Sequence, residues 1–298
     1  MVRTLRLFDT GGWVLPWRVA DAEGYFAAEG FAVEFVKGEG REEDRLLAGT
    51  ADLAASDKES AFVGGQIDIY SACEWGVIKR VVDLGAGKII ANRRTVGMTH
   101  GIYVLPHRGI TSPADLKGVP VAVNLNSGSH FAVVEGLEEV LRPEDVKIVH
   151  FGHPYTRAEA LFTGKVEATA LMEPYSTLAE VRGAVKIAEY PGRGGWIGGD
   201  QLTQDELDGF YRAVRRAVAT LDADPEKYRD ILVDGLRQHD LDPALIEQVR
   251  ARIQVPRYLD PVPYERREFD ATYGWLVEHE LIRPGATFET VVHTAADD

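Results

Sequence analysis

The chain has 298 residues, of which 45% are hydrophobic and 27% are charged, so it can bury a substantial core, and its length predicts about two domains. Acidic residues outnumber basic ones by 47 to 33, and the formal net charge of −14 disfavours nucleic acids and anionic membranes as partners. The single cysteine, Cys73, excludes an intrachain disulfide and any zinc or redox motif built on paired cysteines.

No apolar run of the roughly seven to fifteen residues that a signal peptide requires occurs in the first residues, MVRTLRLFDTGGW. No later segment reaches the roughly eighteen consecutive apolar residues of a membrane span, so direct membrane insertion is not expected. We expect a cytoplasmic protein as the sequence is written, and a periplasmic or extracellular one if a leader has been removed.

Strand-like and helix-like segments alternate over most of the chain, which predicts an α/β fold with mostly parallel sheets. We predict strands at 4–8, 31–36, 67–72, 87–91, 101–105, 119–124, 146–150, 166–171 and 185–189. We predict helices at about 14–28, 56–65, 74–83, 113–117, 129–140, 156–163 and 174–181. After residue 203 apolar residues such as Phe210, Val214 and Leu221 recur at helical spacing, so the last part of the chain is predicted to be helical.

Two passages marked by glycine or proline interrupt this alternation, at 99–109 and 190–201. Glycines permit backbone angles that are closed to other residues, which suits segments that cross between domains. We therefore expect one lobe from residues 1–103 plus 197–298 and a second lobe from 104–196. A ligand cleft is expected between the lobes, at the carboxyl ends of strands.

Four passages carry a family resemblance, and they occur in this order: AEGYFAAEGFAVEFV (22–36), GGQIDIYSACEWG (64–76), TSPADLKGVPVAVNLNSGSHFAVVEGLEEV (111–140) and RAEALFTGKVEATALMEPY (157–175). Together they resemble the type 2 periplasmic binding-protein fold, in the branch of sulfonate-, nitrate- and thiamine-pyrimidine-precursor-binding proteins. The resemblance implies two lobes, each a mostly parallel sheet flanked by helices, with a helical C-terminal part. It also implies closure on a small organic ligand and a membrane permease as partner.

The loop after the first strand contains Asp9, Gly11, Gly12 and Trp13, and in proteins of the resembling fold this loop contacts ligand. Glycines allow a close approach of the backbone, and Trp13 offers a stacking face. We therefore predict that these four residues bind ligand.

A polar loop, Asn126, Ser127, Gly128 and Ser129, follows the strand at 119–124 and precedes a helix that begins near His130. Free N–H groups and small hydroxyls at a helix N-terminus can hold an anion. The alternative is that Ser127 or Ser129 only caps the helix, and both roles are compatible. We predict that all five residues bind ligand.

Arg157 lies in the first turn of its predicted helix, an unfavourable place for a cation. A ligand carboxylate or sulfonate would explain it, although a solvated surface arginine is the alternative. The resemblance places Glu173 and Tyr175 at the cleft. Tyr155 and Trp196 complete the predicted ligand-binding residues of this half of the chain.

The strand at 67–72 leads into Cys73, Glu74 and Trp75, with Ser71 near its end. A helix that begins at residue 74 would stabilise a thiolate on Cys73, whereas unpaired cysteines are commonly buried and inert. Glu74 suits acid–base chemistry or ligand binding, and its alternative is a favourable charge in the first turn of a helix. We include these four residues in the predicted cleft.

His130 is the candidate base for Cys73 or Glu74 if the protein is an enzyme, and its alternative is a structural hydrogen bond. The sequence contains no HExxH, GxxxxGK[ST], GxGxxG or GxSxG motif, so we expect neither a metal nor a cofactor.

Two classes of function remain, and fold alone cannot choose between them. The first is a solute receptor that closes on a small anionic or aromatic ligand, such as a carboxylate, a sulfonate or a pyrimidine, and serves an ABC transporter. The second is a cytoplasmic decarboxylase, dehydratase or other lyase on the same scaffold, with Cys73, Glu74 and His130 as catalytic residues. The aromatic desulfinase of similar fold has its nucleophilic cysteine in the first-strand loop, where this chain has Gly11 and Gly12, so that mechanism is not expected. The general landmarks favour the receptor and the missing leader favours the enzyme.

Overall fold

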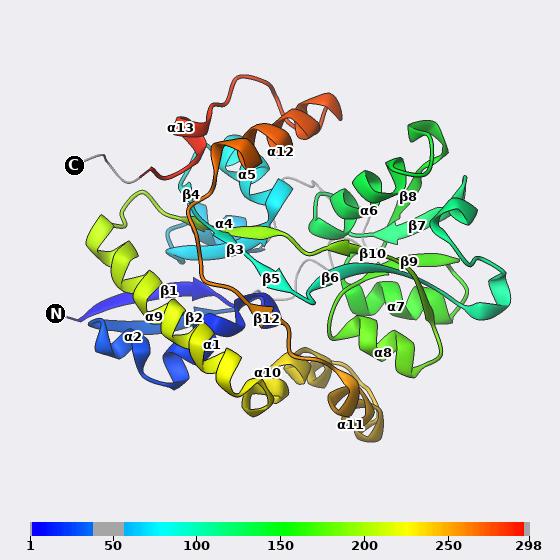
Figure 1. The fold of residues 1–298 in the computed structure, drawn as a ribbon, viewed down its shortest axis with the longest axis horizontal. Helices are drawn as coiled ribbons and strands as arrows, with labels where there is room; N and C mark the ends of the chain where they lie inside the picture. The colour runs from blue at the N-terminus through cyan, green and yellow to red at the C-terminus, as the bar shows by residue number, and fades with distance from the viewer. Residues whose placement is uncertain (1, 38–56, 295–298) are drawn as a thin grey trace.

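Two five-stranded sheets organise the fold of this computed structural model, which describes residues 2–37 and 57–294 (Figure 1). The first sheet has the order β2 (Phe31–Val36), β1 (Arg3–Phe8), β3 (Ile69–Cys73), β11 (Gly194–Gly198) and β4 (Lys88–Arg93). The second sheet has the order β10 (Val185–Pro191), β6 (Thr99–Val104), β9 (Ala168–Leu171), β7 (Pro120–Val123) and β8 (Lys147–His150). The predicted α/β fold with two lobes is confirmed.

Each sheet is mixed, where the sequence led us to expect mostly parallel sheets. In the first sheet β1 is parallel to β2 and β3, while β11 is antiparallel to β3 and β4. In the second sheet β7 is parallel to β8 and β9, while β6 is antiparallel to β9 and β10. The antiparallel strands arise because β6, β10 and β11 adjoin the crossovers between the sheets and enter them without the helix that a parallel connection needs.

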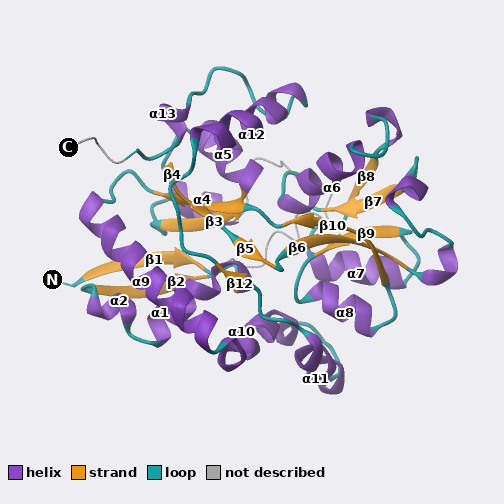
Figure 2. Ribbon diagram, in the orientation of Figure 1, coloured by secondary structure: helices purple, strands orange, loops and turns teal. Residues whose placement is uncertain are grey.

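Helices cover both faces of the sheets (Figure 2). Those of the first lobe are α1 (Leu15–Ala22), α2 (Tyr25–Ala28), α4 (Asp57–Val63), α5 (Glu74–Leu84) and α9 (Gln204–Ala223). Those of the second lobe are α6 (Gly128–Glu138), α7 (Pro154–Phe162) and α8 (Tyr175–Val181). The predicted helix at 14–28 is two helices, because Gly24 has a left-handed φ of 73° between α1 and α2.

The C-terminal part is helical, as expected, and it contacts both lobes. It contains α10 (Arg229–Val233), α11 (Pro243–Arg252), α12 (Arg266–Glu278) and α13 (Phe288–Val291). Helix α11 packs on α8 of the second lobe, whereas α12 packs on α5 of the first. No helix within the described residues is both long and apolar enough to span a membrane.

The chain crosses between the sheets at residues 94–98 and again at 192–193, between strands of different sheets. In the first crossover β5 (Thr95–Val96) pairs with β12 (Arg257–Tyr258), so the C-terminal segment is tied to the crossover. The expected lobe divisions at 103 and 197 fall inside β6 and β11, a few residues from these crossovers.

Strand β11 lies in the glycine-rich passage that the sequence suggested was a crossing segment. A side chain at Gly195 would begin 2.8 Å from the carbonyl oxygen of Ala91, so the close approach of β4 requires glycine there. Trp196 on this strand is 3% exposed and contacts Trp17 and Phe210, with ring centroids 5.4 Å and 5.6 Å away. Its surroundings are the hydrophobic core, and not the cleft in which we predicted it.

Phe210 is the fully buried residue of α9 that joins Trp17 of α1 to Trp196 of β11. We expect Phe210→Ala to lower the free energy of unfolding by about 3–5 kcal/mol, because the cavity left between three elements cannot collapse fully. Urea denaturation measures this change. Arg215→Ala on the exposed face of the same helix is the matched control, with an expected change within about 0.5 kcal/mol, and equal effects of the two substitutions would contradict the assigned core.

Candidate functional site

Residues that follow strands of the first sheet contact residues that follow strands of the second. Trp13, after β1, donates a hydrogen bond from Nε1 to Met172 Sδ, after β9, over 3.1 Å. A methyl group on Gly128, after β7, would lie 3.0 Å from Cβ of Cys73, at the end of β3. The carboxyl ends of strands from both lobes thus face one junction, the usual place of ligand sites in α/β proteins.

Trp13 stacks on two buried side chains at this junction. The guanidinium carbon of Arg93 lies 4.3 Å from the centroid of the indole. The imidazole of His100 stacks on the indole at 5.8 Å, with an angle of 28° between the planes. Arg93 is 5% exposed and His100 is 2% exposed. The indole of Trp13, which we predicted to face a ligand, therefore packs against Arg93 and His100 and fixes their positions.

Arg157 is buried, with 1% exposure, and is not the solvated arginine that the sequence left open as an alternative. Its Nε donates to Ala170 O over 2.9 Å, and its Nη1 donates to Gly152 O. Its Nη2 is buried and has no hydrogen-bond partner. Burial lowers the pKa of Arg157 to about 9, so the guanidinium still carries its charge at neutral pH.

Arg93 and His100 each have a buried nitrogen without a partner, Nε and Nδ1 respectively. Burial lowers the pKa of Arg93 to about 10, although Tyr258 and Cys73 act in the opposite direction. Burial, together with the charges of Arg157 and Arg93, lowers the pKa of His100 to about 3, so this imidazole is neutral. We call Arg93, His100 and Arg157 the cationic centre.

No carboxylate of the described residues contacts either guanidinium of the cationic centre. Buried donors in proteins nearly always have partners, and buried charges are nearly always paired. Three unpartnered nitrogens within one junction therefore point to a group that the protein chain does not itself supply.

The serine hydroxyls of the loop before α6 form hydrogen bonds within that loop. Ser127 Oγ donates to Asn124 O over 2.7 Å, and Ser129 Oγ accepts from Asn124 N over 3.0 Å. Asn126, with a φ of 58°, donates its N–H to His130 Nδ1 over 3.2 Å. Burial lowers the pKa of His130 to about 4. These side chains fix the start of α6, and Gly128 brings this start against His100 Nε2 and Cys73.

Cys73 and Glu74 have different neighbours. Cys73 is the N-cap residue of α5 and lies against Gly128, next to His100. Glu74 instead accepts a hydrogen bond from Thr272 Oγ1 over 2.7 Å. The side chain of Cys73 adjoins the cationic centre at Gly128, whereas Glu74 lines a pocket together with Arg93.

The remaining predicted site residues have protein partners outside the cationic centre. Trp75 packs on Phe131 and Trp275 in the core. Ser71 Oγ donates to Gly195 O, and the carboxylate of Glu173 accepts from the Thr177 hydroxyl. Further contacts join Tyr155 and Tyr175 to His239, Asp9 to the Gly11 N–H, and Gly12 O to the Tyr258 hydroxyl.

From the sequence we predicted Trp13, Cys73, Gly128 and Arg157 as site residues, but we did not predict Arg93 and Met172. Arg93 is the last residue of β4, two residues beyond the strand that we predicted at 87–91, and Met172 lies at the end of a short apolar run. Nothing in the residue types at these two positions marks a ligand contact. His100 lies beside the first crossover, and a single histidine there does not by itself indicate a ligand contact. Within residues 2–37 and 57–294, no group of three His, Cys, Asp or Glu residues could hold a metal ion.

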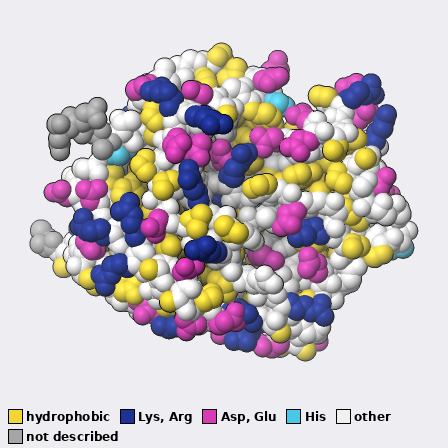
Figure 3. Space-filling view, viewed as in Figure 1, with side chains coloured by type: hydrophobic (Ala, Val, Ile, Leu, Met, Phe, Trp, Pro, Cys, Tyr) yellow, Lys and Arg dark blue, Asp and Glu magenta, His cyan; other side chains and the backbone are white. Residues whose placement is uncertain are grey.

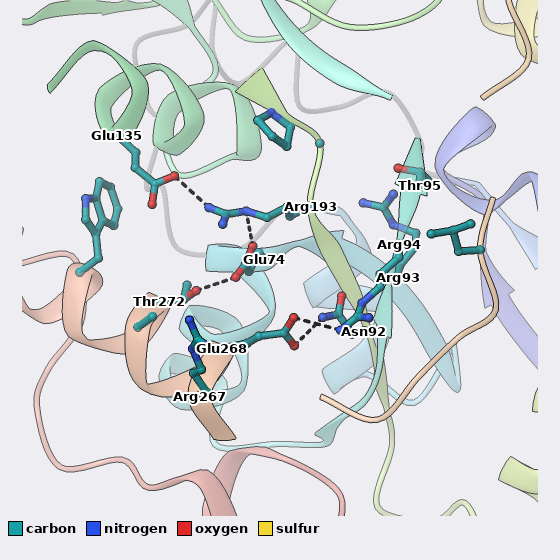
Figure 4. A pocket seen from close by; sticks show the side chains of 15 residues that line it. Glu74, Asn92, Arg93, Arg94, Thr95, Glu135, Arg193, Arg267, Glu268 and Thr272 are labelled. Carbon is teal, nitrogen blue, oxygen red and sulfur yellow. Dashed lines mark hydrogen bonds and ion pairs between the residues drawn. The ribbon is translucent and has the colours of Figure 1, made fainter. Parts of the chain in front are cut away.

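A pocket of about 550 Å³ lies beside the crossovers, and Arg93 of the cationic centre is among the residues that line it (Figure 4). Arg193, in the second crossover, places Nε 2.6 Å from Glu74 Oε2 and Nη2 2.9 Å from Glu135 Oε2. Since Glu74 begins α5 and Glu135 lies on α6, this one guanidinium ties the two lobes together. On the surface in Figure 3 acidic and basic side chains are interspersed across this middle region.

No protein-family model and no curated protein matches the sequence. Solved structures match over nearly the whole chain. The alkanesulfonate-binding protein SsuA from Xanthomonas axonopodis pv. citri, bound to MOPS, is 16% identical over 97% of this chain and 96% of that chain, with a TM-score of 0.71. The aliphatic sulphonate-binding protein SsuA from Escherichia coli is 15% identical over 99% and 93% of the two chains, with a TM-score of 0.73.

The desulfurization enzyme DSZB also matches, at 15% identity over 97% of this chain and 96% of that chain, with a TM-score of 0.60. At such identities these matches establish the fold alone. The fold is that of type 2 periplasmic binding proteins, as the resemblance in the sequence implied.

Glu74 gives the structure a testable pH dependence. Burial raises its pKa above the ordinary value of 4.5, although Arg193 and Thr272 act against this rise. Ionisation of Glu74 therefore opposes folding, and the stability that Glu74 contributes falls as pH rises from 4.5 through its folded-state pKa. We expect wild type to lose stability relative to Glu74→Gln across this pH range, as measured by urea denaturation at several pH values.

The matched control is Glu278→Gln, because Glu278 is an exposed side chain of α12. This substitution removes the same charge without removing a buried carboxylate. A stability difference between wild type and Glu74→Gln that stays constant with pH, or that moves in the opposite direction, would contradict the burial of this carboxylate.

Proposed function

We propose that this protein is a receptor that binds a small organic anion between its two lobes. The observation that carries the proposal is the cationic centre, in which Arg93 and Arg157 are buried without a carboxylate partner among the described residues. A carboxylate or sulfonate accepts hydrogen bonds from guanidinium groups in a well-defined geometry. Such a ligand would satisfy the unpartnered Nε of Arg93 and Nη2 of Arg157.

The surroundings of the cationic centre support an anionic ligand. The N-terminus of α6 lies against His100 and Cys73, and a helix N-terminus carries a partial positive charge. Trp13 and Met172 offer apolar surface for the rest of the ligand. Two proteins of similar structure are named as sulfonate-binding proteins.

Ligand entry would require the lobes to separate about the crossovers. Contacts between the lobes that would then break are Trp13 with Met172, Arg193 with Glu135, and His279 of α12 with Glu138 of α6, the last at 2.9 Å. Closure of this kind commits a bound ligand and excludes water from it. As a receptor the protein would work outside the cytoplasm and pass its ligand to a membrane permease.

The position of Cys73 favours a second candidate function, a lyase that acts on a small organic acid in the cytoplasm. The side chain of Cys73 lies against Gly128 beside His100, at the start of α5. One protein of similar structure is named as a desulfurization enzyme. Mass spectrometry of a bound acid after long incubation separates the two functions, because a receptor returns the acid intact. A lyase returns product, and Cys73→Ser should then abolish turnover.

We expect benzoate or benzenesulfonate to stabilise the protein, and the neutral benzamide and benzenesulfonamide to leave its melting temperature unchanged. A ligand at about 100 times its dissociation constant adds about 2.7 kcal/mol to the free energy of unfolding. Thermal melting therefore detects binding as a rise of several degrees. Equal shifts with anions and with neutral analogues would contradict an anion site.

The variant Arg93→Met tests whether Arg93 itself, and not the surrounding charge, is needed for anion binding. We expect this variant to lose the response to anions while its ligand-free melting temperature stays equal or rises, because an unpaired buried charge has been replaced by an apolar side chain. Arg94→Met is the matched control, since Arg94 is the next residue but is 41% exposed and pairs with Glu268. Loss of the anion response in both variants, or in neither, would contradict the assignment of Arg93.

A further inference from the structure

We infer, building on the proposed function, that the ligand carries two negative charges, as a dicarboxylate, a phosphonate or a phosphate monoester does. Arg93 comes from β4 of the first sheet, and Arg157 comes from α7 of the second lobe. Each is at least nine-tenths buried, and each keeps a nitrogen without a partner. One positive charge from each lobe is thus enclosed at the same junction.

The two guanidiniums belong to one site, because both adjoin His100 of β6. Arg157 Nε donates to Ala170 O, and Ala170 of β9 pairs with Ile102 of β6, two residues from His100. The charges of Arg157 and of Arg93 each act on His100. Trp13 stacks on His100 and on Arg93. His100 itself is neutral and contributes no charge, so the cationic centre carries two positive charges at neutral pH.

The chain supplies a counter-charge to another buried arginine but not to these two. Arg80, whose side chain is 16% exposed, forms an ion pair with Glu59, whose side chain is 4% exposed. The groups that act on Arg93 are Tyr258 and Cys73. Burial raises the pKa of Tyr258 above its ordinary value, so Tyr258 stays a neutral phenol, and its hydroxyl donates to Gly12 O. No carboxylate acts on Arg157.

Charge balance then sets the charge of the ligand. A buried charge without a partner is strongly destabilising, and a monoanion in the closed cleft would leave one guanidinium uncompensated. A dianion compensates both guanidiniums and satisfies an N–H from each lobe. The partial positive charge of the α6 N-terminus adds to this preference.

Phenylphosphonate and benzenesulfonate test the inference, because they share a shape and differ in charge at about pH 8, where the phosphonate is largely a dianion. Isothermal titration in a buffer without phosphate or sulfate gives both affinities. We expect phenylphosphonate to bind at least about tenfold more tightly. Succinate against butyrate, and each benzenedicarboxylate isomer against benzoate, extend the comparison to dicarboxylates, for which the spacing of the two charges also matters.

Three variants assign the preference to the cationic centre. Arg93→Met should reduce the preference for phenylphosphonate to about twofold or less, because one positive charge remains, whereas Arg94→Met should keep it. Cys73→Ser should also keep the preference, and its loss in that variant would assign part of the charge balance to the thiol and overturn the inference.

The outcomes separate this inference from the proposed function. Binding of monoanions as tight as that of dianions in every pair would overturn the inference and leave the anion receptor standing. Absence of binding by all of these anions would overturn both. Tighter binding of phenylphosphonate that survives in Arg93→Met would overturn the assignment of the second charge to Arg93.

Discussion

Two guanidinium groups, one from each lobe, are held away from water at the junction where the lobes meet. Charges that are buried without a counter-charge lose their hydration, so by themselves these two groups favour separation of the lobes. An anion bound between the two guanidiniums compensates their charges, so that the two groups then favour closure of the lobes. The same two side chains can therefore resist closure of the empty cleft and favour closure around a ligand, which is how a ligand shifts a two-state equilibrium. Binding and closure are then a single event in this fold.

The groups that hold the lobes together surround the cationic centre without neutralising it. Trp13 reaches Met172 across the junction, and Arg193 in the second crossover reaches carboxylates of α5 and α6. Arg193 is about half exposed, so this ion pair is a weak tie that solvent screens. Weak ties at the crossovers are consistent with lobes that open and close, whereas the core around Phe210 fixes the first lobe as a rigid body.

The sequence was sufficient to predict the fold, because each long strand is a run of β-branched and other apolar residues between turn signals. We did not predict strand β11, because its glycines are typical of a flexible segment. In the structure, the close approach of β4 is what requires glycine there. Arg157 could be found because a cation in the first turn of a helix is unfavourable and calls for an explanation. Arg93 could not be found, since its burial follows from the packing of Trp13, Met98 and Gly194 against it and from no local pattern. We predicted Trp75 and Trp196 in the cleft, but both lie in the core, because an indole is as compatible with a core as with a cleft.

A crystal structure of the protein grown with phenylphosphonate would show whether one anion binds both guanidiniums. We expect the anion between the lobes, with oxygens at about 2.7–3.2 Å from Arg93 Nε and Arg157 Nη2. We also expect His100 and Trp13 to keep their stacked arrangement beside the anion. An anion bound elsewhere, with both guanidiniums still unpartnered at the junction, would contradict this expectation.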